Sequence, residues 1–141
     1  MRSKPFTASS RAALLKVCDV VRDRLGLGML CTVYEFPRKD DGCETLASSF
    51  IFRAGWRSHV RFYPLFFKKQ LRHQLEIVVH EHLHVMMQPL DQAILDAEYD
   101  LVRPKAREEF INATVTAREI TVDHATGPIY LLLEPYIRRV L

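Results

Sequence analysis

His80, Glu81 and His84 form an H-E-x-x-H pattern inside the apolar run IVVHEHLHVMM, residues 77–87. On an α-helix, residues i and i+4 lie on the same face, so the two histidines can offer imidazole nitrogens to one metal ion. Glu81 follows His80 directly, which places its carboxylate beside such an ion, where it can take a proton from water. The spacing therefore predicts a metal site with an adjacent general base.

A third ligand must come from another segment, because catalytic zinc commonly has three ligands from protein. The segment TAREITVDHATGP offers Glu119 and Asp123 at i, i+4 spacing, in a polar stripe that begins at Asn112 and Thr116. We predict that Glu119 binds the metal and that Asp123 accepts the second N–H of a ligand histidine, which fixes its tautomer. The opposite side of this helix shows Phe110, Ala113, Ala117 and Ile120.

This polar stripe has alternatives. It is also typical of a face that is simply solvated. Glu98, Glu108 and Glu109 compete with Glu119 as ligands, but Glu98 lies close behind a proline. Glu108 and Glu109 fall in the first turns of the expected helix, where acidic residues are favoured by the helix dipole alone.

The helix that carries the motif has two dissimilar sides. One side contains only apolar residues and one histidine: Leu71, Leu75, Val78, Val79, His82 and Met86. His80 and His84 lie nearly opposite, where Lys69, His73 and Glu76 precede them. We therefore expect one side to pack on a sheet and the other to line a polar cleft. His82 is expected to be a packed core histidine.

The remaining patterns indicate an α+β fold. Ser9 or Ser10 can cap a helix to about Leu25, and strands are expected at 30–36, 45–54 and 58–64, the last two joined as a hairpin near Gly55. Alternation puts Val60 and Phe62 on one face of the last strand. Helices are expected at 65–88, ended by Pro89, at 91–101, at 104–126, ended by Gly127-Pro128, and at 129–140, kinked or interrupted at Pro135.

Length and composition set the outer bounds. At 141 residues the chain is expected to be a single domain, and 20 basic against 17 acidic residues give no general preference for nucleic acid. No segment is predicted to be a secretory signal or a membrane span. Cys18, Cys31 and Cys43 form no CxxC pair, so we expect reduced thiols in a cytoplasmic protein and no zinc bound by cysteine.

HExxH followed on a later helix by E-x-x-x-D resembles the glutamate-type zincins, the thermolysin-like metallopeptidases. This resemblance implies zinc bound by His80, His84 and Glu119, with Glu81 as base and Asp123 supporting a histidine. A closer resemblance, over roughly residues 57–126, is to small metallopeptidases encoded by bacteriophages and prophages. It rests on the motif "VVHE-L-H", the segment "PLD", a "P-AREEF" helix start and "E--VD". The interval from His84 to Glu119 is longer than in thermolysin, and we expect a minimal zincin-like domain over 1–141.

The predicted function is a zinc-dependent hydrolase that cleaves peptide bonds. We expect an extended peptide or protein substrate to pair with the strand SHVRFYP. His124, Arg118, Tyr99 and Tyr130 are candidates for the donor that stabilises the oxyanion. For a phage-encoded enzyme, the location would be the host cytoplasm, with no membrane partner.

Two other interpretations stay open at this point. A basic cluster interleaved with aromatic residues could bind nucleic acid by phosphate contacts and base stacking: Arg53, Trp56, Arg57, Arg61, Phe62, Phe66, Lys68, Lys69 and Arg72. Alternatively, the same zinc ligands could stabilise a non-catalytic module of a virion or of a host-interaction component, which would not need Glu81.

Overall fold

The elements of the structure form the predicted α+β fold. The structure, a computed structural model, describes residues 4–52, 57–101 and 103–141. Within them lie the helices α1 (Arg11–Arg24), α2 (Leu71–Leu101) and α3 (Arg107–Ile137), and the strands β1 (Cys31–Glu35), β2 (Ala47–Phe52) and β3 (Arg57–Phe62). Two short 3-10 helices, η1 (Pro64–Lys68) and η2 (Pro104–Ala106), precede the long helices. The first helix and the three strands confirm the prediction.

The strands form one mixed sheet in the order β1-β3-β2. β2 pairs antiparallel with β3, as the predicted hairpin requires, although Gly55 itself lies outside the described residues. β1 pairs parallel with β3. Val60 and Phe62 are fully buried while Arg61 between them is not, so the predicted alternation is confirmed.

The position of β3 corrects one prediction. The strand SHVRFYP was expected to offer its edge to a peptide, but β3 lies between β1 and β2 and both of its edges are paired. β1 and β2 are the edge strands of the described sheet, and of these two β2 has the more extensive contact with α2. Alternation in one strand identifies its buried face but says nothing about its neighbours in the sheet.

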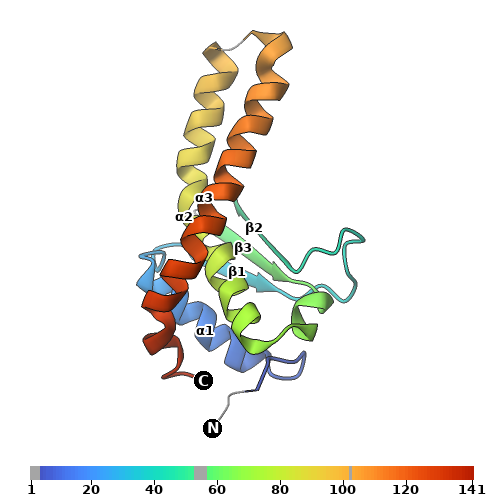
Figure 1. The fold of residues 1–141 in the computed structure, drawn as a ribbon, viewed down its shortest axis with the longest axis vertical. Helices are drawn as coiled ribbons and strands as arrows, with labels where there is room; N and C mark the ends of the chain where they lie inside the picture. Colours follow the sequence, from blue (N-terminus) through green and yellow to red (C-terminus); the bar gives the residue numbers. More distant parts are fainter. Residues whose placement is uncertain (1–3, 53–56, 102) are drawn as a thin grey trace.

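Pro89 and Pro128 were expected to end helices, and Pro135 to kink or interrupt one, but α2 and α3 run through all three. Pro89 lies inside α2, and Pro128 and Pro135 lie inside α3, so the four predicted C-terminal helices are two. Each proline removes one i→i−4 hydrogen bond, at a cost of about 3 kcal/mol. α2 and α3 contact each other extensively as an antiparallel pair (Figure 1), which stabilises both helices on either side of these breaks.

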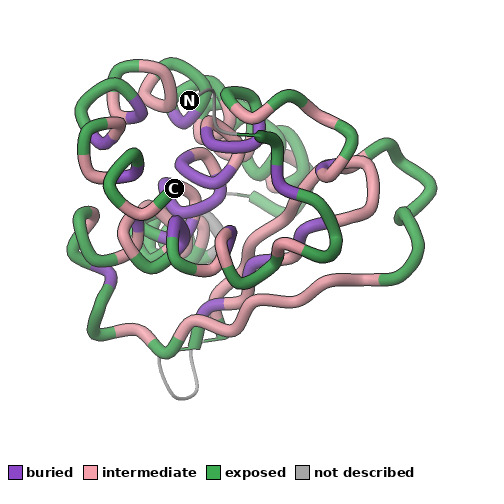
Figure 2. The backbone as a smooth tube through the Cα atoms, turned by 90° about the horizontal axis from the view of Figure 1, so that it is seen from below, coloured by how far each residue is buried: buried purple, intermediate pink, exposed green. Residues whose placement is uncertain are grey.

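The core lies where α1, the sheet, the N-terminal half of α2 and the C-terminal half of α3 meet. Figure 2 shows the buried segments gathered toward the centre of this part of the molecule. The core contains Val17, Cys18 and Val21 from α1, Val60 and Phe62 from β3, Phe66 from η1, Val78 and Val79 from α2, and Val122, Tyr130 and Ile137 from α3. Each fully buried side chain of this size contributes about 1.5–3 kcal/mol. Met86, expected on the packed side of α2, is instead 43% exposed.

Gln74 connects the N-terminal segment to α2. Its buried side chain accepts a hydrogen bond from the Phe6 N–H (2.7 Å) and donates to the carbonyls of Phe6 (3.0 Å) and Phe66 (3.1 Å). The amide thereby bonds backbone groups of the N-terminal segment and of η1 and joins both to α2.

Within the described residues, none of the helices has the length and apolar content needed to cross a membrane.

Candidate metal centre

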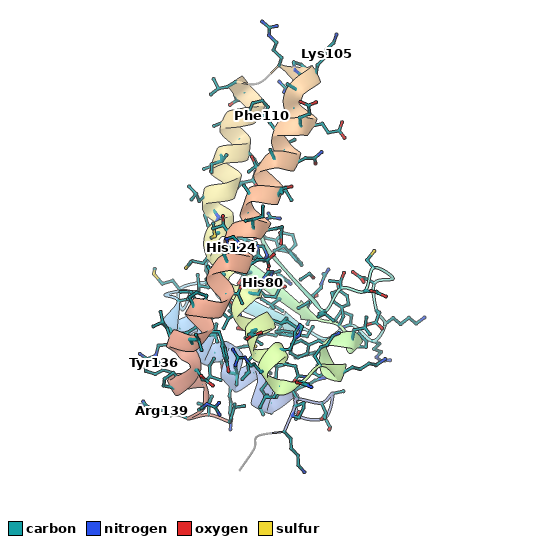
Figure 3. The ribbon with its side chains drawn as sticks, in the orientation of Figure 1. His80, Lys105, Phe110, His124, Tyr136 and Arg139 are labelled. Atoms are coloured by element: carbon teal, nitrogen blue, oxygen red, sulfur yellow. The ribbon has the colours of Figure 1, made fainter. Side chains whose placement is uncertain are left out.

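His80 and His84 lie one turn apart on α2, and their Nε2 atoms are 3.0 Å apart. Both rings are partly buried, and they meet edge to face with centroids 4.6 Å apart. Figure 3 shows His80 where α2 and α3 pass each other, at the level where the helix pair leaves the rest of the molecule. The i, i+4 spacing therefore brings two imidazole nitrogens to one point, as predicted.

Glu119 reaches the same point from α3. Its Oε2 lies 3.3 Å from His84 Nε2, and the ligand atoms of His80, His84 and Glu119 all lie within 4.8 Å of one another. No other group of three potential ligands is found in the described part of the chain. Two ligand atoms of a tetrahedral zinc site, each about 2.1 Å from the ion, lie roughly 3.4 Å apart. The donor set and its spacing fit a metal ion.

The second ring nitrogen of His80 faces α3. Its Nδ1 lies 3.4 Å from Asp123 Oδ1 and 3.4 Å from Thr126 Oγ1. The Thr126 hydroxyl donates its own hydrogen to the Val122 carbonyl (2.7 Å), so toward His80 it can only accept. Two acceptors at Nδ1 favour the tautomer with its proton there, which leaves the Nε2 lone pair available to a metal. Asp123 therefore lies beside the ring nitrogen that it was predicted to contact, and its supporting role stays a prediction.

Arg118 holds the other oxygen of the Glu119 carboxylate. Its guanidinium Nη2 donates to Glu119 Oε1 at 3.1 Å, while Oε2 faces the histidines. A carboxylate fixed in this way presents one oxygen to an ion. Burial lowers the pKa of His84, and the negative charge of Glu119 opposes that change.

Glu81 lies in the same place but is almost completely buried, with 7% of its surface exposed. Burial raises its pKa to about 7, the nearby Ser49 hydroxyl lowers it, and the charge of Glu119 raises it again. Ser49 Oγ is itself buried and has no hydrogen bond of standard geometry, so its effect on Glu81 is that of a nearby dipole. Glu81 is therefore a carboxylate that can exchange a proton near neutral pH.

A cleft runs along β2 past these residues, in two adjoining parts of about 320 and 280 Å³. His80, Glu81 and Ala47 line both parts. The first is completed by Leu46, His73, Glu76, Ile77 and Thr126, and the second by Ser48, Ser49, His84, Gln88, Arg118 and Glu119. His73 and Glu76 confirm the predicted polar side of α2. The β2 residues were not anticipated, because a strand of small residues gives no sign of which helix it faces.

His82, the third histidine of the motif, points into the core as predicted and is 1% exposed. Its Nδ1–H donates to the Val78 carbonyl (2.7 Å), and its Nε2 accepts from the Tyr34 hydroxyl (3.0 Å). Burial lowers the pKa of His82 to about 4, so the ring stays neutral and joins α2 to β1.

The other residues predicted as metal ligands or as oxyanion donors differ in whether they lie at the cleft. Glu108 and Glu109 are exposed in the first turn of α3, far along the helix from Glu119, and the side chains of Glu98 and Tyr99 lie outside the described part of the structure. Of the remaining oxyanion candidates, only Arg118 lines the cleft. His124 is exposed, and the buried Tyr130 donates to Glu134 at 3.2 Å.

In the described part of the basic cluster, the two phenylalanines do not fit the alternative of a base-stacking surface. Phe62 and Phe66 are fully buried in the core, so neither can stack on a base. Arg61 pairs with Glu35, and Arg72 pairs with Glu76 at 3.0 Å. Arg53 and Trp56 lie outside the described residues.

Comparisons with protein-family models, with curated proteins and with solved structures found no match to this chain.

Proposed function

We propose that this chain is a zinc-dependent hydrolase that cleaves peptide bonds. The observation that carries the proposal is the meeting of His80, His84 and Glu119 in one cleft with the buried carboxylate of Glu81. A metal site that serves only stability has no need of a carboxylate held at neutral pKa beside it. The likeness of HExxH and E-x-x-x-D to the thermolysin-like metallopeptidases supports the same conclusion.

Zinc is the metal that two imidazoles and one carboxylate oxygen suit best, since catalytic zinc sites use three such ligands and leave a position open. Bound there, zinc would acidify a water molecule and polarise a substrate carbonyl. Asp123 and Thr126 would keep His80 in the correct tautomer, and Arg118 would hold Glu119 so that one oxygen points inward.

Glu81 would act as the general base and then as the general acid. In the metal-free protein burial raises the pKa of Glu81 to about 7, so this carboxylate can hold and release a proton near neutral pH. A cation bound beside it would favour the ionised form that accepts the proton.

The substrate would be an extended peptide lying along β2. β2 has a free edge in the described sheet, and Ala47, Ser48 and Ser49 line the cleft that contains the three potential ligands. A peptide can add to such an edge through main-chain hydrogen bonds. Arg118, from the opposite wall, is the candidate donor to the substrate carbonyl oxygen.

The proposed compartment is a reducing cytoplasm, that of the host if the chain is phage-encoded. Cys18 is buried, Cys31 and Cys43 are exposed, and all three are free thiols.

The test is Glu81→Gln, with zinc content measured by mass spectrometry and cleavage followed on a peptide library. We expect near-stoichiometric zinc in both proteins and a loss of about 10²–10⁴-fold in cleavage rate in the variant. Glu76→Gln is the matched control, because Glu76 lines the cleft but pairs with Arg72. Zinc binding without cleavage by either protein would instead support a non-catalytic zinc-stabilised module.

The ligand set is tested separately by His80→Ala and Glu119→Ala, each of which should lose zinc. Stoichiometric zinc in the Glu119 variant would remove Glu119 from the site.

A further inference from the structure

The hydroxyl of Ser49 lies between β2 and α2. Ser49 pairs with Val60 in the sheet register, and Val60 is fully buried, so both side chains point to the core face of the sheet. Ser49 Oγ is buried there, and it makes no hydrogen bond of standard geometry to any described residue. A buried polar atom of this kind is an exception in a folded protein and calls for an explanation.

The carboxylate of Glu81 enters the same space from α2. Glu81 has 7% of its surface exposed, and it lines the same part of the cleft as Ser49. Within the described part of the chain, no hydrogen bond of standard geometry reaches this carboxylate. Burial raises the pKa of Glu81 and the Ser49 hydroxyl lowers it, so the hydroxyl is close enough to interact with the carboxylate.

Each of these two groups supplies what the other lacks. A buried donor without an acceptor and a buried carboxylate without a donor both cost free energy, and one hydrogen bond between them removes both costs. A hydroxyl hydrogen rotates freely, and the terminal torsion of a glutamate is broad, so both groups can turn toward each other at little cost. A hydrogen bond to an ionised carboxylate is also stronger than one between neutral groups.

We propose that Ser49 is a positioning residue for Glu81, and that its hydroxyl donates to one carboxylate oxygen while the other stays free to accept a proton. This inference rests on the proposed hydrolase function. A general base must keep its acceptor oxygen within hydrogen-bond reach of the proton that it takes. The side chain of a glutamate has three torsions, so a donor on the neighbouring strand is needed to select one orientation of the carboxylate.

The serines closest to Ser49 in the sheet have other partners. Ser48 points to the opposite face, where its Oγ lies 3.5 Å from the Tyr63 hydroxyl. Ser58 is fully buried on β3, and its hydroxyl lies 2.8 Å from Thr32 Oγ1. Ser49 therefore differs from both in facing a carboxylate of the cleft.

Steady-state kinetics test the positioning role. Ser49→Ala should lower kcat by about tenfold and leave KM and zinc content unchanged, because the hydroxyl acts on the base alone. Ser49→Cys has nearly the same shape but is a weak donor, so it should lose as much. Ser58→Ala removes a buried serine hydroxyl that does not line the cleft, and it should keep the wild-type kcat. A wild-type kcat in Ser49→Ala or in Ser49→Cys would overturn the inference.

The contact itself can be measured without substrate, by urea unfolding of the metal-free protein at pH 8. Ser49→Ala should raise the equilibrium constant for unfolding by about fivefold or more. In a Glu81→Leu background, which has no carboxylate to receive the bond, the same change should have an effect of less than about twofold.

The two experiments separate the possible failures. Equal effects of Ser49→Ala in the two backgrounds would overturn the inference, whatever the activity of the protein. Unequal effects in a protein that cleaves no peptide would overturn the proposed function, and with it the part of Ser49 in catalysis.

Discussion

Asp123 on α3 faces His80 on α2 across the helix contact, with its Oδ1 3.4 Å from the ring Nδ1. Thr126, one turn further along α3, lies at the same distance from that nitrogen. Two side chains of one helix thus offer acceptors to the same ring nitrogen of a histidine on another, and the first prediction concerns their effect on metal affinity.

Asp123→Ala should weaken zinc binding by about 10–100-fold, as the loss of such supporting carboxylates does in other sites. The measurement is a competition titration with a chelator of known affinity. Glu109→Ala removes an exposed carboxylate from the first turn of the same helix and should have no effect. Equal affinities of the Asp123 variant and the wild type would mean that Thr126 alone orients the ring.

Glu81→Gln should stabilise the metal-free protein at pH 8. The folded pKa of Glu81 is about 7 against 4.5 for a free carboxyl, so the folded state binds more protons between these values and loses stability as the pH rises through them. The buried charge costs about 3 kcal/mol above pH 7 and nothing below pH 4.5. Urea unfolding in chelator, at pH 8 and pH 4.5, should therefore show a gain at the higher pH only. A gain of the same size at both pH values would count against a buried carboxylate.

His82 should make the folded state sensitive to acid. Its folded pKa is about 4 and its ordinary value is 6.5, so the unfolded chain binds more protons between them. The stability is fully present above pH 6.5 and falls by up to about 3 kcal/mol toward pH 4. In His82→Leu this fall should be missing. The variant also loses the Tyr34 contact, but that loss of stability is the same at every pH. His124→Leu, at an exposed histidine, should keep the wild-type slope.

Gln74→Met should lower the free energy of unfolding by about 1–3 kcal/mol, because it leaves the buried Phe6 N–H without an acceptor. Urea unfolding at neutral pH provides the measurement. Gln70→Met, at an exposed glutamine just before α2, is the matched control. A loss that is equal in the two variants would contradict the role of Gln74 as a connector.

The metal cluster was predictable because helical periodicity is a local property. His80 and His84 needed only one helix, and Glu119 and Asp123 needed only a second helix packed against it. His82 was separated from them by the same periodicity. The strands were predictable for a similar reason, since Val60 and Phe62 alternate with polar residues.

Features that depend on neighbours were not predictable. Pro89 and Gly127-Pro128 are local signals for a helix end, but the contact between α2 and α3 outweighs them. The central place of β3 follows from pairing on both sides, which no single strand encodes. Gln74 bonds the N–H and carbonyl of Phe6 and the carbonyl of Phe66. A single glutamine in the sequence gives no sign of such contacts.

The prolines inside α2 and α3 have a mechanical consequence. Pro89 gives the Val85 carbonyl no N–H partner, and Pro128 does the same to the carbonyl of His124. Each long helix therefore lacks a backbone hydrogen bond near the ligands that it carries. In α2 the missing bond lies beyond His84, toward the end of the helix, and in α3 it lies beyond Glu119, toward the core. Bending at these two places would tilt Glu119 relative to His80 and His84. A force on the projecting ends of α2 and α3 would therefore change the distance between the Glu119 carboxylate and the two imidazoles.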